Sequence, residues 1–491
     1  MRYDVVIVGA GLGGLECAYI LAKKGLNVCV LEKEAQVGGC LQMFRRRGHA
    51  FDTGFHYVGG LGDGEPLNRL FSYFGLMDLP WVRMDSDAFD EVCIGGRQYL
   101  YANGFDNFAA RMADYFPLRR EALKRYVATL KEVNDNIVHS FDRRSAEDVY
   151  TQSLFARPAY GFLKEVLEDT DVIDAVSGAS LKMELDPDTL PLYIFAQINA
   201  SFISSAWRLR GGGAQIGERL ADSIRRMGGT VLTGCEATAF IEDSDRLTAV
   251  RLADGECIHA DWFISDIHPA ATMRLLDESR LIRRIYRNRI IRMANTAGMF
   301  TVNCELHEGA VPYFNRNRYA YDSGDIWHLC RRTADAPVKG IMISCQPPED
   351  GSASTRNIDI LTPMPWTEVE QWAGTRPMRR GEEYEAMKRR RADECLSFAE
   401  RYLPGLKSAV KYAYTSTPLS YADYTATAEG SAYGVRKDCN DLMYTLLTPR
   451  TPAGNLLLTG QNLNLHGILG VSMTSFMTCA EIVGPVNPFI I

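Results

Sequence analysis

The first 32 residues constrain the fold of this chain more than any other segment. An apolar run of strand length, Tyr3 to Val8, leads into the turn Gly9-Ala-Gly11-Leu-Gly13-Gly14 and then into a helix-like stretch. A second apolar run, Asn27 to Leu31, ends on Glu32. The dinucleotide fingerprint consists of a strand, a helix and a second strand, with G-x-G-x-x-G in the first turn and an acid about 20 residues further on. This segment has all of these parts. The sequence therefore predicts a βαβ unit that opens a Rossmann-like α/β domain.

Each part of this fingerprint has a physical task. Gly9 permits the tight turn, Gly11 lets the backbone approach a diphosphate, and Gly14 lets helix and strand pack closely. The diphosphate would meet the free N–H groups and the positive end of the helix. Glu32 would accept hydrogen bonds from the adenosine ribose. A glycine-rich turn without a ligand is the alternative, and the agreement of strand, helix, spacing and acid disfavours it.

The segment after Glu32 favours FAD over NAD. Lys33 is followed by the glycine pair Gly38-Gly39, by Cys40, and by the stretch FRRRGHAFDTGFHYVGG from Phe44 to Gly60. The glycine pair suits a second close approach of backbone to the cofactor phosphates. Rossmann dehydrogenases that bind NAD do not need such an approach at this point.

Three blocks of the chain resemble one group of flavoproteins. The N-terminal block reads G-A-G-L-G-G, V-G-G and F-D-T-G-x-H-Y-x-G, the central block runs from Arg210 to Phe240, and the C-terminal block runs from Asn455 to Val471. A hairpin with Asp254-Gly255 as its turn follows the central block. These blocks are similar to the phytoene desaturases, carotenoid isomerases and retinol saturases, and the match is best with the retinol-saturase and carotenoid-isomerase branch.

The resemblance implies a two-domain α/β fold like that of the amine oxidases and the GDP-dissociation inhibitors. Residues 1–75, 205–290 and 430–491 would form a discontinuous Rossmann-like FAD-binding domain. Residues 76–204 and 291–429 would form an inserted α+β substrate domain. Within the insertion, residues 105–126 and 133–202 read as mostly helical, and Leu190 to Ala206 is its most apolar stretch, either a pocket wall or plain core.

The resemblance also implies a set of cofactor contacts. The family usually carries Val in the adenine-side strand where this chain has Ala237, and backbone contacts to adenine would survive that change. The expected contact residues are Gly9, Gly11, Gly13, Gly14, Glu32, Lys33, Gly38, Gly39, Cys40, Asp52, Thr53, Gly54, Ala237, Gly460, Gln461, Gly467, Gly470 and Val471.

The activity implied is FAD-dependent oxidoreduction at CH–CH groups of a long apolar polyene or isoprenoid. A flavin transfers hydride at N5, and the protein supplies orientation and electrostatics. Saturation, desaturation and isomerisation all need an apolar slot, exclusion of water and at most one proton donor. His56, Tyr57 and His466 are the candidate catalytic residues. His466 has a second possible role, in which it stabilises negative charge on the flavin together with a helix N-terminus.

Two alternative functions remain open from the sequence. A flavin amine oxidase shares the fold, but its usual C-terminal signature does not match L-H-G-I-L-G here. A lipid or prenyl carrier of the GDP-dissociation-inhibitor kind has no redox activity, and the intact Gly9, Gly11, Gly14 and Glu32 disfavour it. No motif chooses between saturase, desaturase and isomerase. No second dinucleotide motif is visible, so the electron donor or acceptor is expected to be a diffusing partner.

Composition excludes several other classes of protein. A net charge of −7 and a pI near 5.7 argue against a nucleic-acid partner. The twelve cysteines are scattered without C-x-x-C or C-x₄-C spacing, which excludes disulfide reductases and predicts no metal site. Scattered thiols and the lack of an apolar run of about 18 residues favour a cytoplasmic protein.

Two basic clusters have more than one interpretation. Arg45-Arg46-Arg47 could offset the charge of the diphosphate or be solvated surface. Cations and acids alternate from Arg379 to Glu394, which predicts an exposed helix with i,i+4 pairs. The alternative for this second cluster is peripheral docking on anionic lipid, from which a lipophilic substrate could be drawn.

Overall fold

The N-terminal apolar run forms β1 (Arg2–Val8), a strand in which Val5, Val6 and Ile7 have no exposed surface. The structure is a computed structural model that describes residues 2–137, 149–331, 333 and 336–489. β1 lies within a seven-stranded sheet of order β10-β2-β1-β13-β12-β11, in which β21 also pairs with β13. The other strands are β2 (Val28–Leu31), β10 (Thr230–Leu232), β11 (Ala237–Asp243), β12 (Arg246–Leu252), β13 (Cys257–Ser265) and β21 (Leu456–Leu458).

Five strands of this first sheet run parallel and end in register. Val8 at the end of β1 pairs with Leu31 and Ser265, and Ser265 pairs with Leu458. Leu232 of β10 pairs with Leu31 as well. The segments that follow these strands therefore emerge at one edge of the sheet, where doubly wound folds bind their ligands. They begin with Gly9, Glu32, Asp266 and Thr459.

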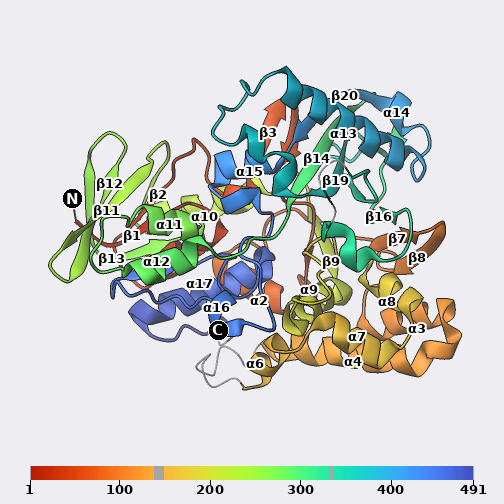
Figure 1. Cartoon of the computed structure of the whole chain (residues 1–491), viewed down its shortest axis with the longest axis horizontal. Helices are drawn as coiled ribbons and strands as arrows, with labels where there is room; N and C mark the ends of the chain where they lie inside the picture. Colours follow the sequence, from red (N-terminus) through yellow and green to blue (C-terminus); the bar gives the residue numbers. More distant parts are fainter. Residues whose placement is uncertain (1, 138–148, 332, 334–335, 490–491) are drawn as a thin grey trace.

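Three helices are closely associated with the first sheet: α1 (Leu12–Lys23), α10 (Ala214–Arg226) and α17 (Gly467–Val483). α1 packs against both α10 and α17. The contact with α17 buries the carboxyl group of Glu16. Ser472 Oγ and Ser475 Oγ donate hydrogen bonds of 2.6 and 2.9 Å to it. This part of the molecule lies at the left and bottom centre of Figure 1.

A second seven-stranded sheet lies at the upper right of Figure 1 and has the order β20-β14-β19-β17-β16-β7-β8. α13 (Glu382–Glu400) packs on its β17, β19 and β20 strands. The strands are β7 (Asp90–Ile94), β8 (Arg97–Tyr101), β14 (Gly298–Leu306), β16 (Asn317–Tyr321), β17 (Gly340–Ser344), β19 (Asn357–Met364) and β20 (Val410–Ser416).

A layer of helices lies below this second sheet in Figure 1. α9 packs against α3, α4, α6 and α7, and nearly all of its side chains are buried. The predicted helical character of the insertion is thus confirmed where the structure describes it, and residues 138–148 of that prediction lie outside the described part. The helices are α3 (Phe105–Tyr115), α4 (Arg120–Asp135), α6 (Val149–Phe155), α7 (Ala159–Leu167), α8 (Thr170–Ser177) and α9 (Leu192–Ser204).

Shorter elements connect these layers. The three-stranded sheet β5-β9-β6 carries the chain between the two large sheets, and β3-β4 and β15-β18 are two-stranded. Their bounds are β3 (Met43–Arg46), β4 (His49–Asp52), β5 (Val58–Gly59), β6 (Trp81–Arg83), β9 (Ala206–Leu209), β15 (Val311–Pro312) and β18 (Ser354–Thr355). The remaining α-helices of the described residues are α2 (Pro66–Phe74), α11 (Pro269–Arg274), α12 (Arg284–Ile291), α14 (Leu406–Ala409), α15 (Pro418–Thr425) and α16 (Leu442–Thr445).

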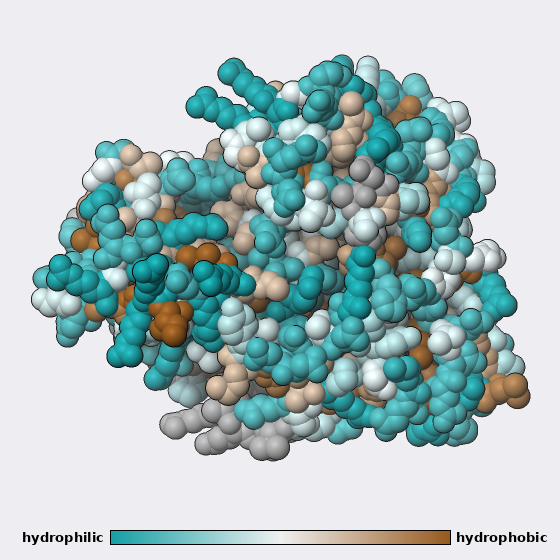
Figure 2. Space-filling view, in the orientation of Figure 1, coloured by the Kyte–Doolittle hydropathy of each residue, from teal (hydrophilic) through white to brown (hydrophobic). Residues whose placement is uncertain are grey.

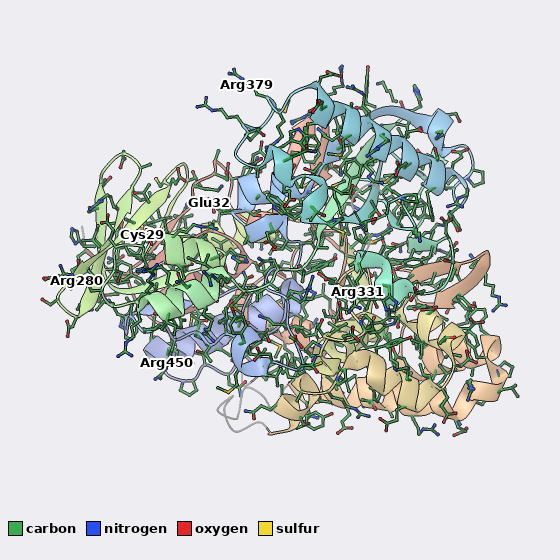
Figure 3. All side chains as sticks on the ribbon, viewed as in Figure 1. Cys29, Glu32, Arg280, Arg331, Arg379 and Arg450 are labelled. Carbon is green, nitrogen blue, oxygen red and sulfur yellow. The ribbon has the colours of Figure 1, made fainter. Side chains whose placement is uncertain are left out.

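The charge cluster around α13 is not uniformly exposed, contrary to the prediction. Arg391 has no exposed surface and pairs with Glu368 at 2.6 Å, and buried Arg380 pairs with Asp423. Tertiary packing converts these two cations into internal ion-pair partners. Arg379 does project into solvent at the upper rim of Figure 3.

The surface in Figure 2 is mostly hydrophilic, with scattered apolar side chains. Arg45, Arg46 and Arg47 are at least partly exposed, and the Arg47 guanidinium lies 4.2 Å from the centre of the Tyr412 ring, which favours the solvated interpretation of this cluster. Among the helices of the described residues, none has both the length and the apolar character needed to cross a bilayer.

The buried carboxyl of Glu16 predicts a pH-dependent stability. Burial raises its pKa from 4.5 to about 8, although the two serine hydroxyls lower it. The folded state therefore binds a proton that the unfolded state releases between these values, and stability is lost as pH rises toward 8. We expect the free energy of unfolding of Glu16→Gln to match that of the native protein at pH 5. At pH 9 it should be larger by about a few kcal/mol, as the size of the pKa shift implies. Urea unfolding at both pH values measures this, and an equal difference at both would contradict it.

Candidate functional site

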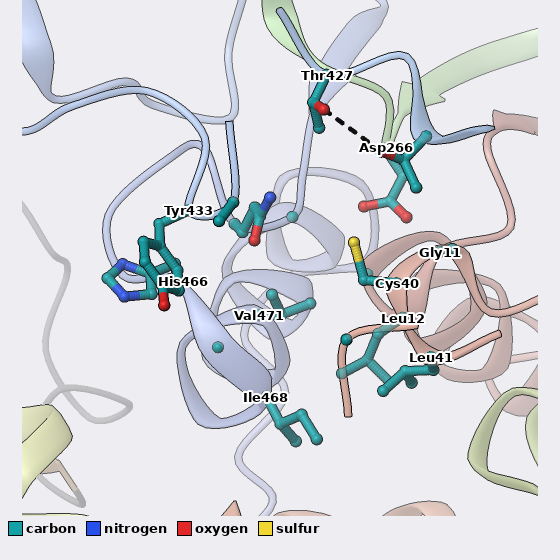
Figure 4. A pocket seen from close by; sticks show the side chains of 18 of the residues that line it. Gly11, Leu12, Cys40, Leu41, Asp266, Thr427, Tyr433, His466, Ile468 and Val471 are labelled. Atoms are coloured by element: carbon teal, nitrogen blue, oxygen red, sulfur yellow. Dashed lines mark hydrogen bonds between the residues drawn. The ribbon is translucent and has the colours of Figure 1, made fainter. Parts of the chain in front are cut away.

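A cavity of about 560 Å³ lies where the carboxyl edge of the first sheet meets the second sheet and the helical layer. One end is lined by the loops that follow β1, β2, β13 and β21, and the other by side chains of α9, β14, β17 and β19. Figure 4 shows part of this lining, with Gly11, Leu12 and Cys40 on one side and Tyr433 and His466 on the other.

Backbone rather than side chain forms the first end of the cavity. A Cβ added to Gly39 would lie 3.2 Å from Gly11 Cα, and one added to Gly13 would lie 3.1 Å from Gly460 Cα. Gly11 and Gly38 also form an isolated parallel bridge. The N-terminus of α1 opens into the same space, so its N–H groups and its dipole can receive an anion there. These features fit a cofactor diphosphate.

A buried carboxyl group, Asp266, lies beside this cradle. It directly follows β13, lines the cavity, and accepts hydrogen bonds from the backbone N–H groups of Gly14 and Gly11. Burial raises its pKa to about 7, with Glu32 adding a further upward effect. Figure 4 shows the Cys40 sulfur pointing toward Asp266. Burial and this neighbouring charge raise the pKa of the Cys40 thiol to about 11, so the thiol is neutral.

Glu32 and the adenine-side residues line the same end of the cavity. Glu32 Oε2 accepts from Ala10 N and Oε1 accepts from Glu34 N, each at 2.9 Å, and burial raises the Glu32 pKa. Each oxygen keeps a second lone pair for a ribose hydroxyl. Lys33 and Ala237 are also part of the lining.

Four of the expected cofactor residues lie behind the lining and support it. Asp52 accepts a 2.8 Å hydrogen bond from Gly213 N, which fixes the start of α10, and a second one from Gln346. Thr53 Oγ1 donates to the carbonyl of Cys40 and so holds the loop of the glycine pair. Gly14 and Gly470 permit close packing, since a Cβ there would lie 2.2 Å from Gly9 O and 2.3 Å from Leu465 O. Those in the lining are Gly9, Gly11, Gly13, Glu32, Lys33, Gly38, Gly39, Cys40, Gly54, Ala237, Gly460, Gln461, Gly467 and Val471.

His466 is the N-cap residue of α17 and lines the cavity. Its ring contacts Tyr433 with centroids 4.8 Å apart, and its Nε2 lies 3.2 Å from the carbonyl of Lys182. Burial lowers the pKa of His466 to about 4, so the ring is neutral at pH 7. Because a carbonyl only accepts, Nε2 carries the proton and Nδ1 is left as an acceptor.

His56 and Tyr57 line the cavity together with His466. Burial lowers the pKa of His56 to about 4, and its Nδ1 lies 3.9 Å from Asp359 Oδ2. Tyr57 Oη donates to Asp90 Oδ2 at 3.0 Å and lies 2.7 Å from the Tyr319 hydroxyl. The structure thus brings all three candidate catalytic residues to one cavity, with both imidazoles neutral at pH 7.

Three polar residues of the cavity region were not predicted from the sequence. Lys182 Nζ lies 3.4 Å from Tyr57 Oη and 3.9 Å from Asp90 Oδ2, and burial lowers its pKa to about 8. Burial raises the pKa of Asp90 to about 6. Gln197 lies on the apolar helix α9. The sequence did contain a signal for Lys182 and Gln197: each places a polar group near apolar residues that were expected to be buried. Such groups are rarely buried without a partner.

The remaining wall forms an apolar chamber around these polar groups. Side chains of the second sheet, of α9, of the loop before it and of segments near the C-terminus converge there. They include Leu181, Ile198, Phe202, Met299, Met342, Leu361, Tyr421, Tyr433 and Leu465. Lys182 Nζ lies 4.2 Å from the centre of the Phe202 ring, so its charge is held by a ring face as well as by Asp90.

Comparisons with known proteins agree with this geometry. The NAD(P)-binding Rossmann-like domain family matches residues 7–74. All-trans-retinol 13,14-reductase of Danio rerio is 24% identical over 527 residues, which cover 98% of this chain and 86% of that protein. Prolycopene isomerase of Daucus carota is 22% identical over 463 residues, which cover 88% and 72%.

A solved structure shows the same fold. A variant of putrescine oxidase with a redesigned cofactor-binding site superposes with a TM-score of 0.68 at 16% identity and covers 99% of this chain and 100% of that one. The predicted Rossmann-like two-domain architecture of the amine oxidases is therefore confirmed. Over most of its length the chain is similar to the retinol 13,14-reductases and prolycopene isomerases, the group that its motifs resemble.

Proposed function

We propose that this protein is an FAD-dependent oxidoreductase that adds or removes hydride at a carbon–carbon double bond of a long apolar polyene or isoprenoid. The observation that carries the proposal is the continuity of one cavity from a backbone diphosphate cradle to an apolar chamber. The retinol 13,14-reductases and prolycopene isomerases among its relatives support it.

The shape of the cofactor end supports FAD. The lining extends from Ala237 past Gly11, Gly39 and Gly460 to the N-terminus of α17 at Gly467. Two helix N-termini thus face one elongated site, which suits a diphosphate at α1 and a second electron-rich group at α17. Bound FAD would supply hydride transfer at its flavin ring.

The two sheets support a division of labour along the chain. Among the described residues, strands of the first sheet come only from residues 1–75, 205–290 and 430–491, and those of the second only from residues 76–204 and 291–429. We assign the cofactor to the first set and the substrate to the second.

The chamber's own residues would position the alkene and supply a proton. Apolar walls from the second sheet and α9 exclude water, which suits hydride chemistry. Lys182 is the buried cation of this chamber, and its lowered pKa keeps it an effective acid near neutral pH. Tyr57 accepts a hydrogen bond from Lys182 while donating to Asp90, so it orients the ammonium. We infer that His56 and His466 act as neutral hydrogen-bonding groups.

The fold likeness to putrescine oxidase keeps an amine oxidase as the second candidate. The chamber end of the described lining offers no carboxylate to hold an ammonium group, and nearby Asp90 is already matched by Lys182, which disfavours a cationic amine substrate. The electron donor or acceptor remains a diffusing partner in this proposal.

The test of function is anaerobic. The flavin of the purified protein is reduced with dithionite, polyenes are added, and flavin reoxidation is followed together with product mass. Reoxidation with a product two hydrogens heavier supports saturation, and an isomer of unchanged mass supports isomerisation. A colourless protein that does not bind FAD, or reduction of the oxidised flavin by amines alone, would refute the proposal.

Asp266 predicts that cofactor affinity depends on pH. An ionised Asp266 repels a diphosphate at Gly11, whereas a protonated one does not. Affinity for FAD should therefore fall as pH rises above about 7, by up to about tenfold per pH unit if only the protonated form binds. Asp266→Asn should bind FAD equally from pH 6 to 9, as measured by flavin fluorescence quenching of apoprotein.

Asp266 has three titratable neighbours that could also make FAD affinity depend on pH: Glu32, Glu16 and Cys40. The Asp266→Asn variant separates their effect from that of Asp266. A pH dependence that persists unchanged in Asp266→Asn would place the titrating group among them instead.

Lys182 predicts the pH profile of turnover. Because the acid must be protonated, kcat should be flat below pH 8 and decline above it. Lys182→Met should lower kcat by roughly 10²–10⁴-fold at unchanged FAD content. Tyr57→Phe should shift the pH at which kcat begins to fall, and it should lower kcat by less than Lys182→Met does. Loss of turnover in His56→Gln but not in Lys182→Met would contradict this assignment.

A further inference from the structure

The amide of Gln197 is placed where a polar group needs a partner. Gln197 lies on α9, has no exposed surface, and lines the cavity beside Ile198. Its Oε1 and Nε2 are both without a hydrogen-bond partner among the described residues. Burying such a group without a partner destabilises a fold, so an amide that stays unpaired in the protein alone points to a ligand.

Other polar groups of the same helix are satisfied within the protein. Asn199 Nδ2 donates to the carbonyl of Phe195, and Ser201 Oγ donates to the carbonyl of Ile198, each at 2.9 Å. Asn199 Oδ1 accepts from Ser180 at 3.4 Å. Ser201 lines the cavity as Gln197 does, but its hydroxyl is paired, so Gln197 differs in having its hydrogen-bonding capacity free.

The charged groups of the chamber leave little role for a charged ligand. Lys182 is matched by Asp90 and by the hydroxyl of Tyr57, so its charge is already compensated. His56 Nε2 is a second unpartnered nitrogen of the lining, on a ring that is neutral at pH 7. The group that the chamber offers on α9 is therefore an uncharged amide with donor and acceptor side by side.

We propose that Gln197 is a specificity-determining residue that binds a hydroxyl group on an otherwise apolar substrate. A hydroxyl donates one hydrogen bond and accepts another, so it pairs with both Oε1 and Nε2. A carboxylate only accepts and would bring an uncompensated charge, and a hydrocarbon would leave both amide atoms unpaired. This inference rests on the proposed function, because it takes the chamber to be the site of an apolar alkene.

The experiment compares three probes of equal carbon skeleton on the FAD-loaded, oxidised protein. They are all-trans-retinol, its deoxy analogue with methyl in place of hydroxymethyl, and retinoic acid, and binding is followed by perturbation of the flavin spectrum. The native protein should bind the alcohol at least about tenfold more tightly than either other probe, a difference typical of one hydrogen-bonded group in a closed site.

Gln197→Met keeps the length of the side chain and removes both polar atoms. It should weaken binding of the alcohol by about tenfold and leave the deoxy analogue within about twofold. The ligand-free variant should melt at the same temperature as the native protein or higher, because an unpaired buried amide has been removed. Ser201→Ala is the matched control: its hydroxyl is satisfied inside α9, so the preference for the alcohol should persist.

Three results would overturn the inference: equal affinity for alcohol and deoxy analogue in the native protein, tightest binding of the acid, or parallel loss of both neutral probes in Gln197→Met. Each is distinct from failure of the proposed function. Selective binding of the alcohol without reoxidation of reduced flavin, reduction of oxidised flavin or isomerisation of the polyene would reject the polyene reaction and keep the Gln197 subsite. If both neutral probes bind with equal affinity and both reoxidise the reduced flavin, the polyene reaction stands and the Gln197 subsite is rejected. Absence of binding by all three probes would reject the polyene reaction and the Gln197 subsite together.

Discussion

The close approach of three backbone loops at one edge of the first sheet is the contact on which the rest of the structure depends. Gly11, Gly39 and Gly460 come from segments far apart in the sequence, yet a Cβ at Gly39 or Gly13 would collide or nearly collide with the neighbouring loop. Parallel strands that end in register make this meeting possible. The diphosphate cradle, the N-terminus of α17 and the entrance to the apolar chamber are all positioned by it.

Burial sets the charge state of the cavity that follows from this contact. Desolvation raises the pKa of Asp266 and Asp90 and lowers that of His56, His466 and Lys182 toward or below neutrality. The two imidazoles are therefore neutral at pH 7, whereas the pKa values of Asp266, Asp90 and Lys182 lie within about one unit of neutrality. A cavity with few fixed charges suits an apolar substrate, and the two helix ends supply the directed polarity that remains.

Local patterns in the sequence were sufficient for the elements whose geometry depends on near neighbours. The first strand, turn and helix, and the hairpin at Asp254-Gly255, follow from turn chemistry and apolar spacing, and the structure contains them. The exposed helix predicted around Arg379 to Glu394 was wrong for Arg380 and Arg391, because Asp423 and Glu368, which lie outside that helix, bury them, although Arg391 also pairs with Glu394 within it. A helical charge pattern carries no information about partners supplied by other elements.

The sequence by itself determined the dinucleotide-binding unit and the loops that form it, since glycine spacing and a ribose acid act over about 30 residues of contiguous chain. Only the tertiary structure decided which groups face the apolar chamber. Lys182 from a loop and Gln197 from α9 line it, and Asp90 of β7 lies behind Lys182; they meet through packing of the inserted segments. Their pKa shifts and free hydrogen-bonding groups arise from burial, which is a property of the assembled fold and not of any local stretch of residues.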